Sequence, residues 1–162
     1  MITGKKNKLF LFNLFIVFIA LLSSCTQLDT FEKDTSIPKY EWKSSFEVKG
    51  SFSITDTTSR YTASIVIRHT DNYKYNNLWL NVGIQYPGDS MFYQKVNVEL
   101  AKSDEKGWEG TGMNDIWEIR QLLSNKPVEF KKTGTYNFSI TQIMRDDPLP
   151  AVMSAGLRLE KK

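Results

Sequence analysis

The chain has 162 residues, 41% of them hydrophobic and 13% aromatic, which is enough apolar material for one globular core. Its formal net charge is +3, which equals the charge of the three lysines in the first eight residues, Lys5, Lys6 and Lys8. Residues 25–162 then hold 18 basic and 18 acidic side chains, and this balance lacks the electrostatic footprint of a nucleic-acid-binding protein.

The first segment has the layout of a secretory signal. Three lysines and no acid precede Leu9–Leu22, a stretch that is almost wholly apolar. As a helix this stretch would be about 21 Å long, too short to cross a hydrocarbon core of roughly 30 Å comfortably. We therefore predict that residues 1–24 are a cleaved signal peptide and not a transmembrane helix.

The signal ends in a motif for lipid attachment. The run Leu22-Ser23-Ser24-Cys25 resembles the lipobox of bacterial lipoproteins, and Cys25 is the only cysteine of the chain, so no intramolecular disulfide can form. The resemblance implies a diacylglycerol on the Cys25 thiol and a further, palmitate-type chain on its freed amino group, which together anchor the protein in a membrane. Thr26 follows in place of the Asp that retains many such proteins in the inner membrane. We expect an outer-membrane anchor, with either leaflet open.

The segment after the anchor is polar and shows little periodicity. We predict that residues 25–45 are the lipidated N-terminus and a tether, and that residues 46–162 are the folded domain. Phe31, Tyr40 and Trp42 could dock part of this tether, so its free length is an upper bound.

Six runs of alternating apolar and polar residues follow, with turn residues between them. Their apolar positions are Phe46, Val48, Phe52 and Ile54; Tyr61, Ala63, Ile65 and Ile67; Leu78, Leu80, Val82, Ile84 and Tyr86; Val96, Val98 and Leu100; Tyr136, Phe138 and Ile140; and Leu157 and Leu159. Strands with one buried face at this spacing predict a mainly β domain, an antiparallel, jelly-roll-like β-sandwich.

Two segments are harder to assign. The apolar positions of residues 116–123 fit either one face of a helix or the inner face of a strand that also has Gln121 on that face. The surrounding predicted strands favour the strand. Pro148 and Pro150 exclude a long regular element, so residues 146–153 are predicted to form a loop or a single helical turn.

The sequence offers no catalytic set. His69, the only histidine, shares the parity of the apolar residues before it, which favours a place against the core. No Gly-x-Ser-x-Gly elbow accompanies it, and the adjacent Asp146 and Asp147 suit a turn better than a metal site or a glycosidase pair. We expect no enzyme activity, cofactor or metal.

Three aromatic residues lie outside the core pattern. Trp79 and Tyr93 sit opposite apolar faces, and Trp108 lies in an expected loop. Such residues can stack sugars, which would make the protein a glycan-binding lipoprotein; the alternative is that Trp79 packs under the tether or a second layer.

Two short motifs raise the question of modification. Asp56-Thr57-Thr58 and Asp89-Ser90 resemble sites of envelope O-glycosylation in some bacteria, with Thr57 and Ser90 as acceptors. The alternative is that the two aspartates hydrogen-bond the backbone of exposed turns.

Beyond the lipobox, the order of several motifs resembles the gliding-motility lipoprotein GldH family. The motifs are Tyr73-x-Tyr75 with Asn77-Leu78-Trp79-Leu80, Gly107-Trp108-Glu109-Gly110-Thr111-Gly112, Gly134-Thr135-Tyr136-Asn137-Phe138, Met144-Arg145-Asp146-Asp147-x-Leu149 and Gly156-Leu157-Arg158-Leu159-Glu160. They extend from Cys25 to the C-terminus. The resemblance implies an envelope lipoprotein that acts as an accessory or structural component of the gliding machinery and the associated type IX secretion system. Its expected partners are membrane lipid, through acylated Cys25, and other envelope proteins of that apparatus. It implies no catalytic residue.

Overall fold

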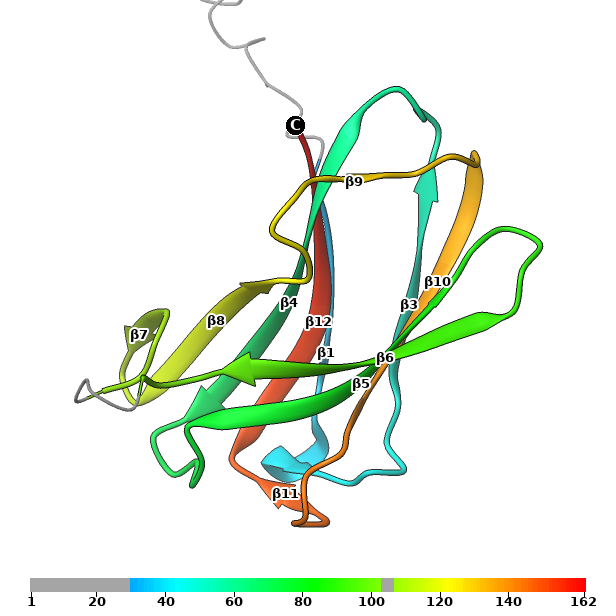
Figure 1. The fold of residues 1–162 in the computed structure, drawn as a ribbon. Coiled ribbons are helices and arrows are strands. Elements are labelled where there is room, and N and C mark those ends of the chain that lie inside the picture. Colours follow the sequence, from blue (N-terminus) through cyan, green and yellow to red (C-terminus); the bar gives the residue numbers. More distant parts are fainter. Residues whose placement is uncertain (1–29, 103–106) are drawn as a thin grey trace, which may run out of the picture.

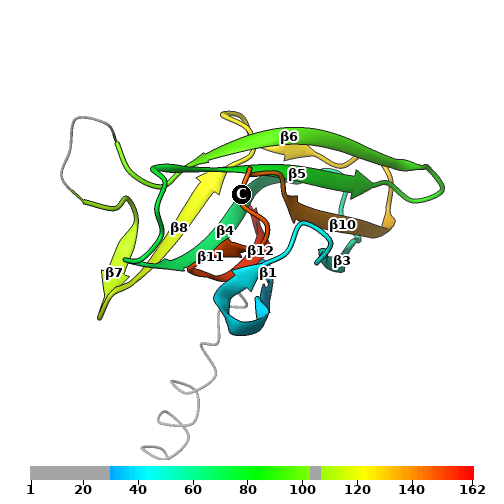
Figure 2. The ribbon, with the colours of Figure 1, turned by 90° about the horizontal axis from the view of Figure 1, so that it is seen from below.

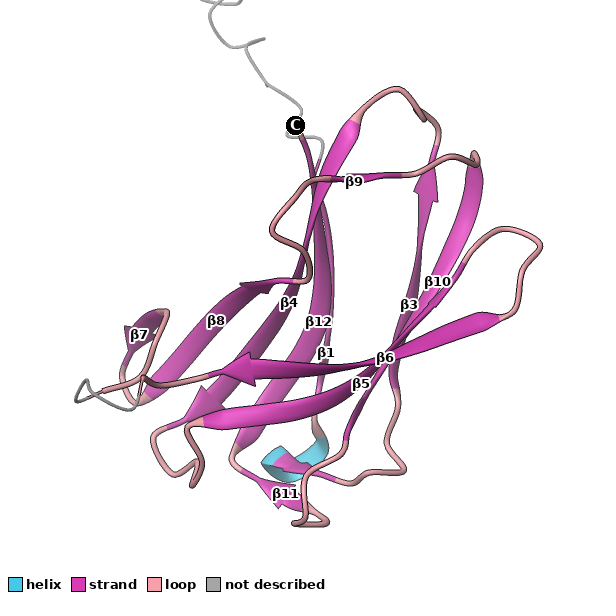
Figure 3. Cartoon of the chain, in the orientation of Figure 1, coloured by secondary structure: helices cyan, strands magenta, loops and turns pink. Residues whose placement is uncertain are grey.

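The alternating runs of the sequence become antiparallel strands in a computed structural model, which describes residues 30–102 and 107–162 (Figure 1). The regular structure of these residues is nearly all strand, with one short 3-10 turn, η1 (Pro38–Tyr40) (Figure 3). Within the same ranges, no helix has the length and apolar character needed to cross a membrane. The strands are β1 (Thr30–Ser36), β2 (Glu41–Trp42), β3 (Val48–Ile54), β4 (Arg60–Thr70), β5 (Asn77–Gln85), β6 (Met91–Glu99), β7 (Thr111–Met113), β8 (Ile116–Leu122), β9 (Val128–Glu129), β10 (Gly134–Gln142), β11 (Leu149–Pro150) and β12 (Val152–Lys161).

The strands form two main sheets that face each other. Sheet I has the order β1-β12-β4-β8-β7, with β9 added beside the start of β4, and sheet II has the order β3-β10-β5-β6. All strand pairs among the described residues are antiparallel. Apart from the β5–β6 hairpin within sheet II, each long strand is followed along the chain by a long strand of the other sheet, and the first and last strands are neighbours, which is the strand order of a jelly roll. The predicted mainly β, jelly-roll-like sandwich is confirmed.

The core lies between the two sheets, which are seen as two layers in Figure 2. The predicted runs bury or half-bury the face assigned to them by parity, except that Tyr86, at the end of the third run, is 41% exposed. The largest fully buried side chains are Trp42, Tyr136, Phe138, Ile37, Ile65, Ile67, Leu78, Leu80, Leu100, Ile140, Leu149 and Leu157. Aromatic rings join the layers: the ring centroid of Phe31 in sheet I lies 5.6 Å from that of Phe52 in sheet II.

The predicted tether is wrong over most of its length. Thr30–Ser36 forms β1 and pairs along its whole length with β12, from Thr30 opposite Glu160 to Ser36 opposite Ser154. Beyond β1, Ile37 and Trp42 are 2% and 0% exposed, so they belong to the core. The folded domain therefore includes residues 30–45, because backbone pairing with β12 stabilises a strand whose side chains carry little apolar pattern.

The two ambiguous segments have different outcomes. Ile116–Leu122 is strand β8, as favoured, and it makes a hairpin with β7 through Asn114 and Asp115. Both turn residues have positive φ, 49° and 63°, as a type I′ turn requires. The loop predicted for residues 146–153 is too long: Leu149–Pro150 pairs with β2 as β11, and β12 already begins at Val152.

Candidate functional site

The lipobox lies just outside the described residues. Leu22, Ser23, Ser24 and Cys25 precede residue 30, so the structure gives no geometry for the predicted anchor. It does place Thr30, the first residue that the structure describes. Thr30 pairs with Glu160, so the chain enters the sandwich beside its own C-terminal strand, at the end of sheet I that appears at the top of Figure 1.

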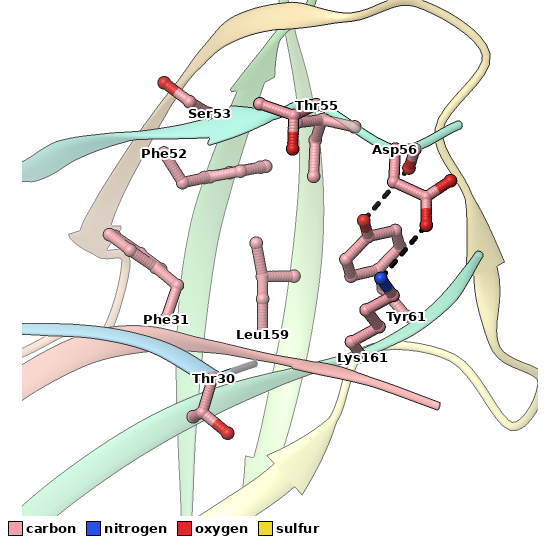
Figure 4. Close-up of a pocket in the computed structure, with 10 residues that line it drawn as sticks. Thr30, Phe31, Phe52, Ser53, Thr55, Asp56, Tyr61, Leu159 and Lys161 are labelled. Carbon is pink, nitrogen blue, oxygen red and sulfur yellow. Dashed lines mark hydrogen bonds and ion pairs between the residues drawn. The ribbon is translucent and has the colours of Figure 1, made fainter. Parts of the chain in front are cut away.

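A pocket of about 320 Å³ opens at this same end, between β1 and β12 of sheet I and β3 of sheet II (Figure 4). Phe31, Phe52 and Leu159 form its apolar floor, and Asp56 and Lys161 lie at its rim. The combination of an apolar floor and a polar rim suits contact with an amphipathic molecule.

The rim carboxylate is held by the turn that follows β3. The Asp56 carboxylate accepts hydrogen bonds from the backbone N–H of Thr58 at 2.8 Å and from its hydroxyl at 2.6 Å, and it forms an ion pair with Lys161 at 3.0 Å. The hydroxyl of Ser59 also donates to it. These hydrogen bonds, those from Ser59 and Thr58 foremost, hold the pKa of Asp56 well below its usual range. A carboxylate that stays ionised and fully engaged is suited to shaping a turn and not to proton transfer.

The predicted acceptor Thr57 lies in that turn, and Ser90 lies in the turn between β5 and β6; both are exposed. The hydrogen bond from the Thr58 backbone to Asp56 matches the turn-forming alternative for the first motif. The second aspartate, Asp89, forms an ion pair with Lys132 at 2.9 Å. Glycosylation of the Thr57 or Ser90 hydroxyl stays a prediction.

The three predicted aromatic residues do not gather in one place. Trp79 and Tyr93 are 41% and 49% exposed and point to the outer face of sheet II, because Tyr93 pairs with Gly83, which has the parity of Trp79 on β5. On β5, Trp79 and Gly83 are four positions apart, which is about 13 Å along the strand. A Cβ built on Gly83 would lie 2.7 Å from the Tyr93 ring, so this ring rests over the glycine. Trp108 packs inward instead, with its ring centroid 4.6 Å from that of His69.

His69 has the place against the core that its parity predicts. It is fully buried on β4, and its ring also contacts Tyr73, at a centroid distance of 5.6 Å. Its Nδ1 lies 3.1 Å from the carbonyl oxygen of Thr70, and its Nε2 has no hydrogen-bond partner in the described part of the chain. Burial lowers the pKa of His69. A buried imidazole that contacts aromatic rings is placed for packing and not for general-base catalysis.

One polar cluster was not anticipated from the sequence. On the outer face of sheet I, Arg68 contacts Glu118 at 2.7 Å, Glu118 contacts Arg120 at 2.7 Å, and Arg158 contacts Glu32. Opposite charges two residues apart on β8, and again on β12 at Arg158 and Glu160, are local signals for this cluster, whereas the neighbours on β1 and β4 depend on sheet pairing. Because acids and bases are paired across four strands, the cluster ties sheet I together and leaves little net charge. The described residues contain no group of three or more His, Cys, Asp or Glu side chains that could hold a metal ion.

Comparisons with known proteins agree with the resemblance inferred from the motifs. The family model described as GldH lipoprotein matches residues 29–159. The gliding motility lipoprotein GldH homolog of Christiangramia forsetii is 30% identical over 155 residues, which cover 91% of this chain and 93% of that protein. The gliding motility lipoprotein GldH of Flavobacterium johnsoniae is 28% identical over 149 residues, covering 88% of this chain and 91% of that protein. These relatives are named as lipoproteins and not as enzymes.

Proposed function

This chain belongs to the GldH lipoprotein family, and we propose that it is an outer-membrane-anchored, accessory structural component of the gliding motility apparatus and the associated type IX secretion system. The observation that carries the proposal is the family match over residues 29–159, which spans the described sandwich except for the last two residues of β12. The lipobox before it supplies the anchor.

The proposed anchor rests on Cys25 and its neighbours. Acyl chains on the thiol and the amino group of Cys25 would hold the protein permanently, because two chains already suffice for stable anchoring. Thr26 supports the outer membrane as the destination, since it is not the residue that retains such proteins in the inner membrane. The mature protein would then present one sandwich to envelope partners.

Three variants in cells test this proposal. Deletion of the gene is expected to impair colony spreading or the secretion of type IX cargo where that apparatus is present. Cys25→Ser is expected to give an unprocessed precursor without acyl chains and no complementation. Thr26→Asp is expected to keep the acyl chains but to move the protein from the outer-membrane to the inner-membrane fraction. Normal spreading and secretion in the deletion strain would contradict the proposed role.

A second function is favoured by one specific observation, the exposure of Trp79 and Tyr93 on one face of sheet II. Aromatic residues whose backbone positions are about 13 Å apart along the strand, with Asn81 and Lys95 on the same face between them, could stack and hydrogen-bond an extended glycan. We therefore propose glycan binding as the alternative role.

A glycan array with the purified protein tests the alternative. Trp79→Ala and Tyr93→Ala are each expected to abolish any binding. Phe92→Ala is the matched control, because Phe92 is 65% exposed on the same strand as Tyr93 but points to the opposite face of the sheet. Equal loss in the control, or no binding by the unmodified protein, would contradict glycan recognition by this face.

A further inference from the structure

The antiparallel strands place the loops of the sandwich at two opposite ends. We call one the N-terminal end; it consists of Thr30, residues 55–60, 86–90, 123–133 and 161–162. The distal end consists of residues 37–47, 71–76, 100–102, 107–110, 114–115 and 143–151. In Figure 1 the C-terminus, β9 and the β3–β4 loop lie at the top, whereas η1 and β11 lie at the bottom.

The two ends carry opposite net charge. The N-terminal end has six basic and three acidic side chains: Arg60, Lys126, Lys131, Lys132, Lys161 and Lys162 against Asp56, Asp89 and Glu129. The distal end, in its described residues, has five basic and seven acidic side chains: Lys39, Lys43, Lys74, Lys102 and Arg145 against Glu41, Glu47, Asp71, Glu109, Asp115, Asp146 and Asp147. Since residues 25–162 are neutral in total, the sandwich is polarised along its long axis.

The positive surplus is available at the surface. Arg60 is paired with Glu129 at 3.1 Å, and the two other acids of this end are paired with Lys132 and Lys161. Three further lysines, Lys126, Lys131 and Lys162, are exposed, and Lys162 also lies within electrostatic range of Glu160 on β12.

The position of the anchor brings this end close to the bilayer. Only four residues, 26–29, separate Cys25 from Thr30. Even fully extended, the chain between them spans at most about 17 Å. Electrostatic attraction in physiological salt decays over about 8 Å, and the short connection lets this end come within that distance of anionic headgroups, where a positive surface is attracted to them.

We infer that the N-terminal end docks directly on an anionic lipid surface, an inference that depends on the lipid anchor proposed above. The short connection limits the distance, and the positive surplus selects this end over the distal one. The pocket of Figure 4 then opens toward the headgroups, and its polar rim and apolar floor match that boundary. The distal end points away from the bilayer and is free to meet envelope partners.

Fluorescence quenching in vesicles tests this orientation. The mature acylated protein is purified in detergent and reconstituted into vesicles of phosphatidylcholine, with or without phosphatidylglycerol, that carry a nitroxide-labelled headgroup lipid. Thr133→Cys, at the N-terminal end, and Asn72→Cys, at the distal end, each place one fluorophore on an exposed position. We expect quenching to be severalfold stronger at position 133, to increase with phosphatidylglycerol and to weaken with salt.

A charge-reversal triple variant and a matched control complete the test. Combined Lys126→Glu, Lys131→Glu and Lys162→Glu is expected to remove the dependence on phosphatidylglycerol. Combined Lys39→Glu, Lys43→Glu and Lys74→Glu, at the distal end, is expected to preserve it. Equal quenching at the two reporter positions, or equal effects of the two triple variants, would overturn the inference.

The mass of the same samples separates this inference from the proposed anchor. If Cys25 carries no acyl chains, the anchor itself is wrong. If Cys25 is acylated and quenching is equal at both ends, the anchor stands and only the docking of the N-terminal end is wrong.

Discussion

His69 couples the stability of the sandwich to pH. Burial lowers its pKa, so below its ordinary value of about 6.5 the unfolded chain binds a proton that the folded chain does not. Stability should therefore fall as the pH drops through 6.5, by at most about 1.4 kcal/mol per pH unit, whereas above 6.5 both states are neutral and His69 contributes no pH dependence.

Urea unfolding of residues 26–162 at about pH 7.5 and about pH 5.5 measures this effect, with His69→Phe as the comparison. The variant keeps a ring beside Trp108 and Tyr73 but has no imidazole, so we expect its stability to fall less over this interval. The carboxylates are the same in both proteins and cancel in the comparison. Parallel losses in the two proteins would show that His69 is not the group responsible.

Thr57 and Ser90 allow a second prediction for single residues. The Asp56 carboxylate is already engaged by its own turn, and both predicted acceptors lie at the N-terminal end of the sandwich, where a bulky glycan would hold the domain off the bilayer. We expect the intact mass of the native protein to equal polypeptide plus acyl chains. Excess mass that disappears in Thr57→Ala or Ser90→Ala would instead establish the modification.

At the level of elements, the contact between β1 and β12 depends on a missing side chain. A Cβ built on Gly156 would lie 2.4 Å from the backbone oxygen of Lys33, so the two strands approach too closely for any larger residue. We expect Gly156→Ala to destabilise the domain by about 1–3 kcal/mol, as overpacking does in a rigid interior. Thermal unfolding of the variant measures the loss.

Ser154→Ala is the matched control for this prediction. Ser154 lies two residues away on the same strand, is buried, and its hydroxyl has no hydrogen-bond partner in the described part of the chain. Its removal is expected to be neutral or slightly stabilising. A loss as large as that of Gly156→Ala would mean that β12 tolerates no change at all, and the argument from close approach would fail.

A second element-level prediction concerns the open edge of sheet II. Gln121 of β8 accepts a hydrogen bond from the backbone N–H of Glu99 at 2.8 Å and donates one to the carbonyl of Asn97 at 2.7 Å, so one side chain joins the edge of β6 to sheet I. Gln121→Leu should cost about 1–3 kcal/mol in chemical unfolding, because two backbone groups lose their partner. Gln121→Glu retains the acceptor and should cost less; an equal cost would contradict the hydrogen-bond explanation.

The sequence predicts the strands that bury one full apolar face and misses those that do not. The six alternating runs correspond to β3, β4, β5, β6, β10 and β12 because a core on one side imposes a period of two on apolar residues. The inward positions of β1 are Phe31, Lys33 and Thr35, of which only Phe31 is apolar, so no alternation marks this strand. Its place is fixed by backbone pairing with β12, which no local pattern encodes.

The candidate site shows the same limit. The alternation of side chains along a strand correctly predicts that Trp79 and Tyr93 face away from the core, because each belongs to a regular strand. Trp108 lies outside the regular strands, where no parity applies, and its contact with His69 depends on how a long connection returns to the core. The pairing of Arg68 with Glu118 likewise joins residues 50 positions apart.

At the level of the whole molecule, one core joins both sheets, so the sandwich should unfold as a unit. Phe138 in sheet II is 1% exposed, and its ring centroid lies 6.5 Å from that of Phe31 in sheet I. Phe138→Ala should therefore cost about 3–5 kcal/mol and should shift tryptophan fluorescence and far-ultraviolet circular dichroism together. Separate transitions for the two signals would contradict a single cooperative core.

The pairing of the first strand with the last also sets the order of events when the protein is made. Among the described residues, β1 pairs in sheet I with β12 alone, so this N-terminal strand cannot form its pairing until the ten residues of β12 have been synthesised. Contacts this distant in sequence form slowly. A chain exported from its N-terminus and acylated at Cys25 would thus be tethered to the membrane before its sheet could close, and a stop codon ahead of β12 would leave an anchored chain with no partner for β1.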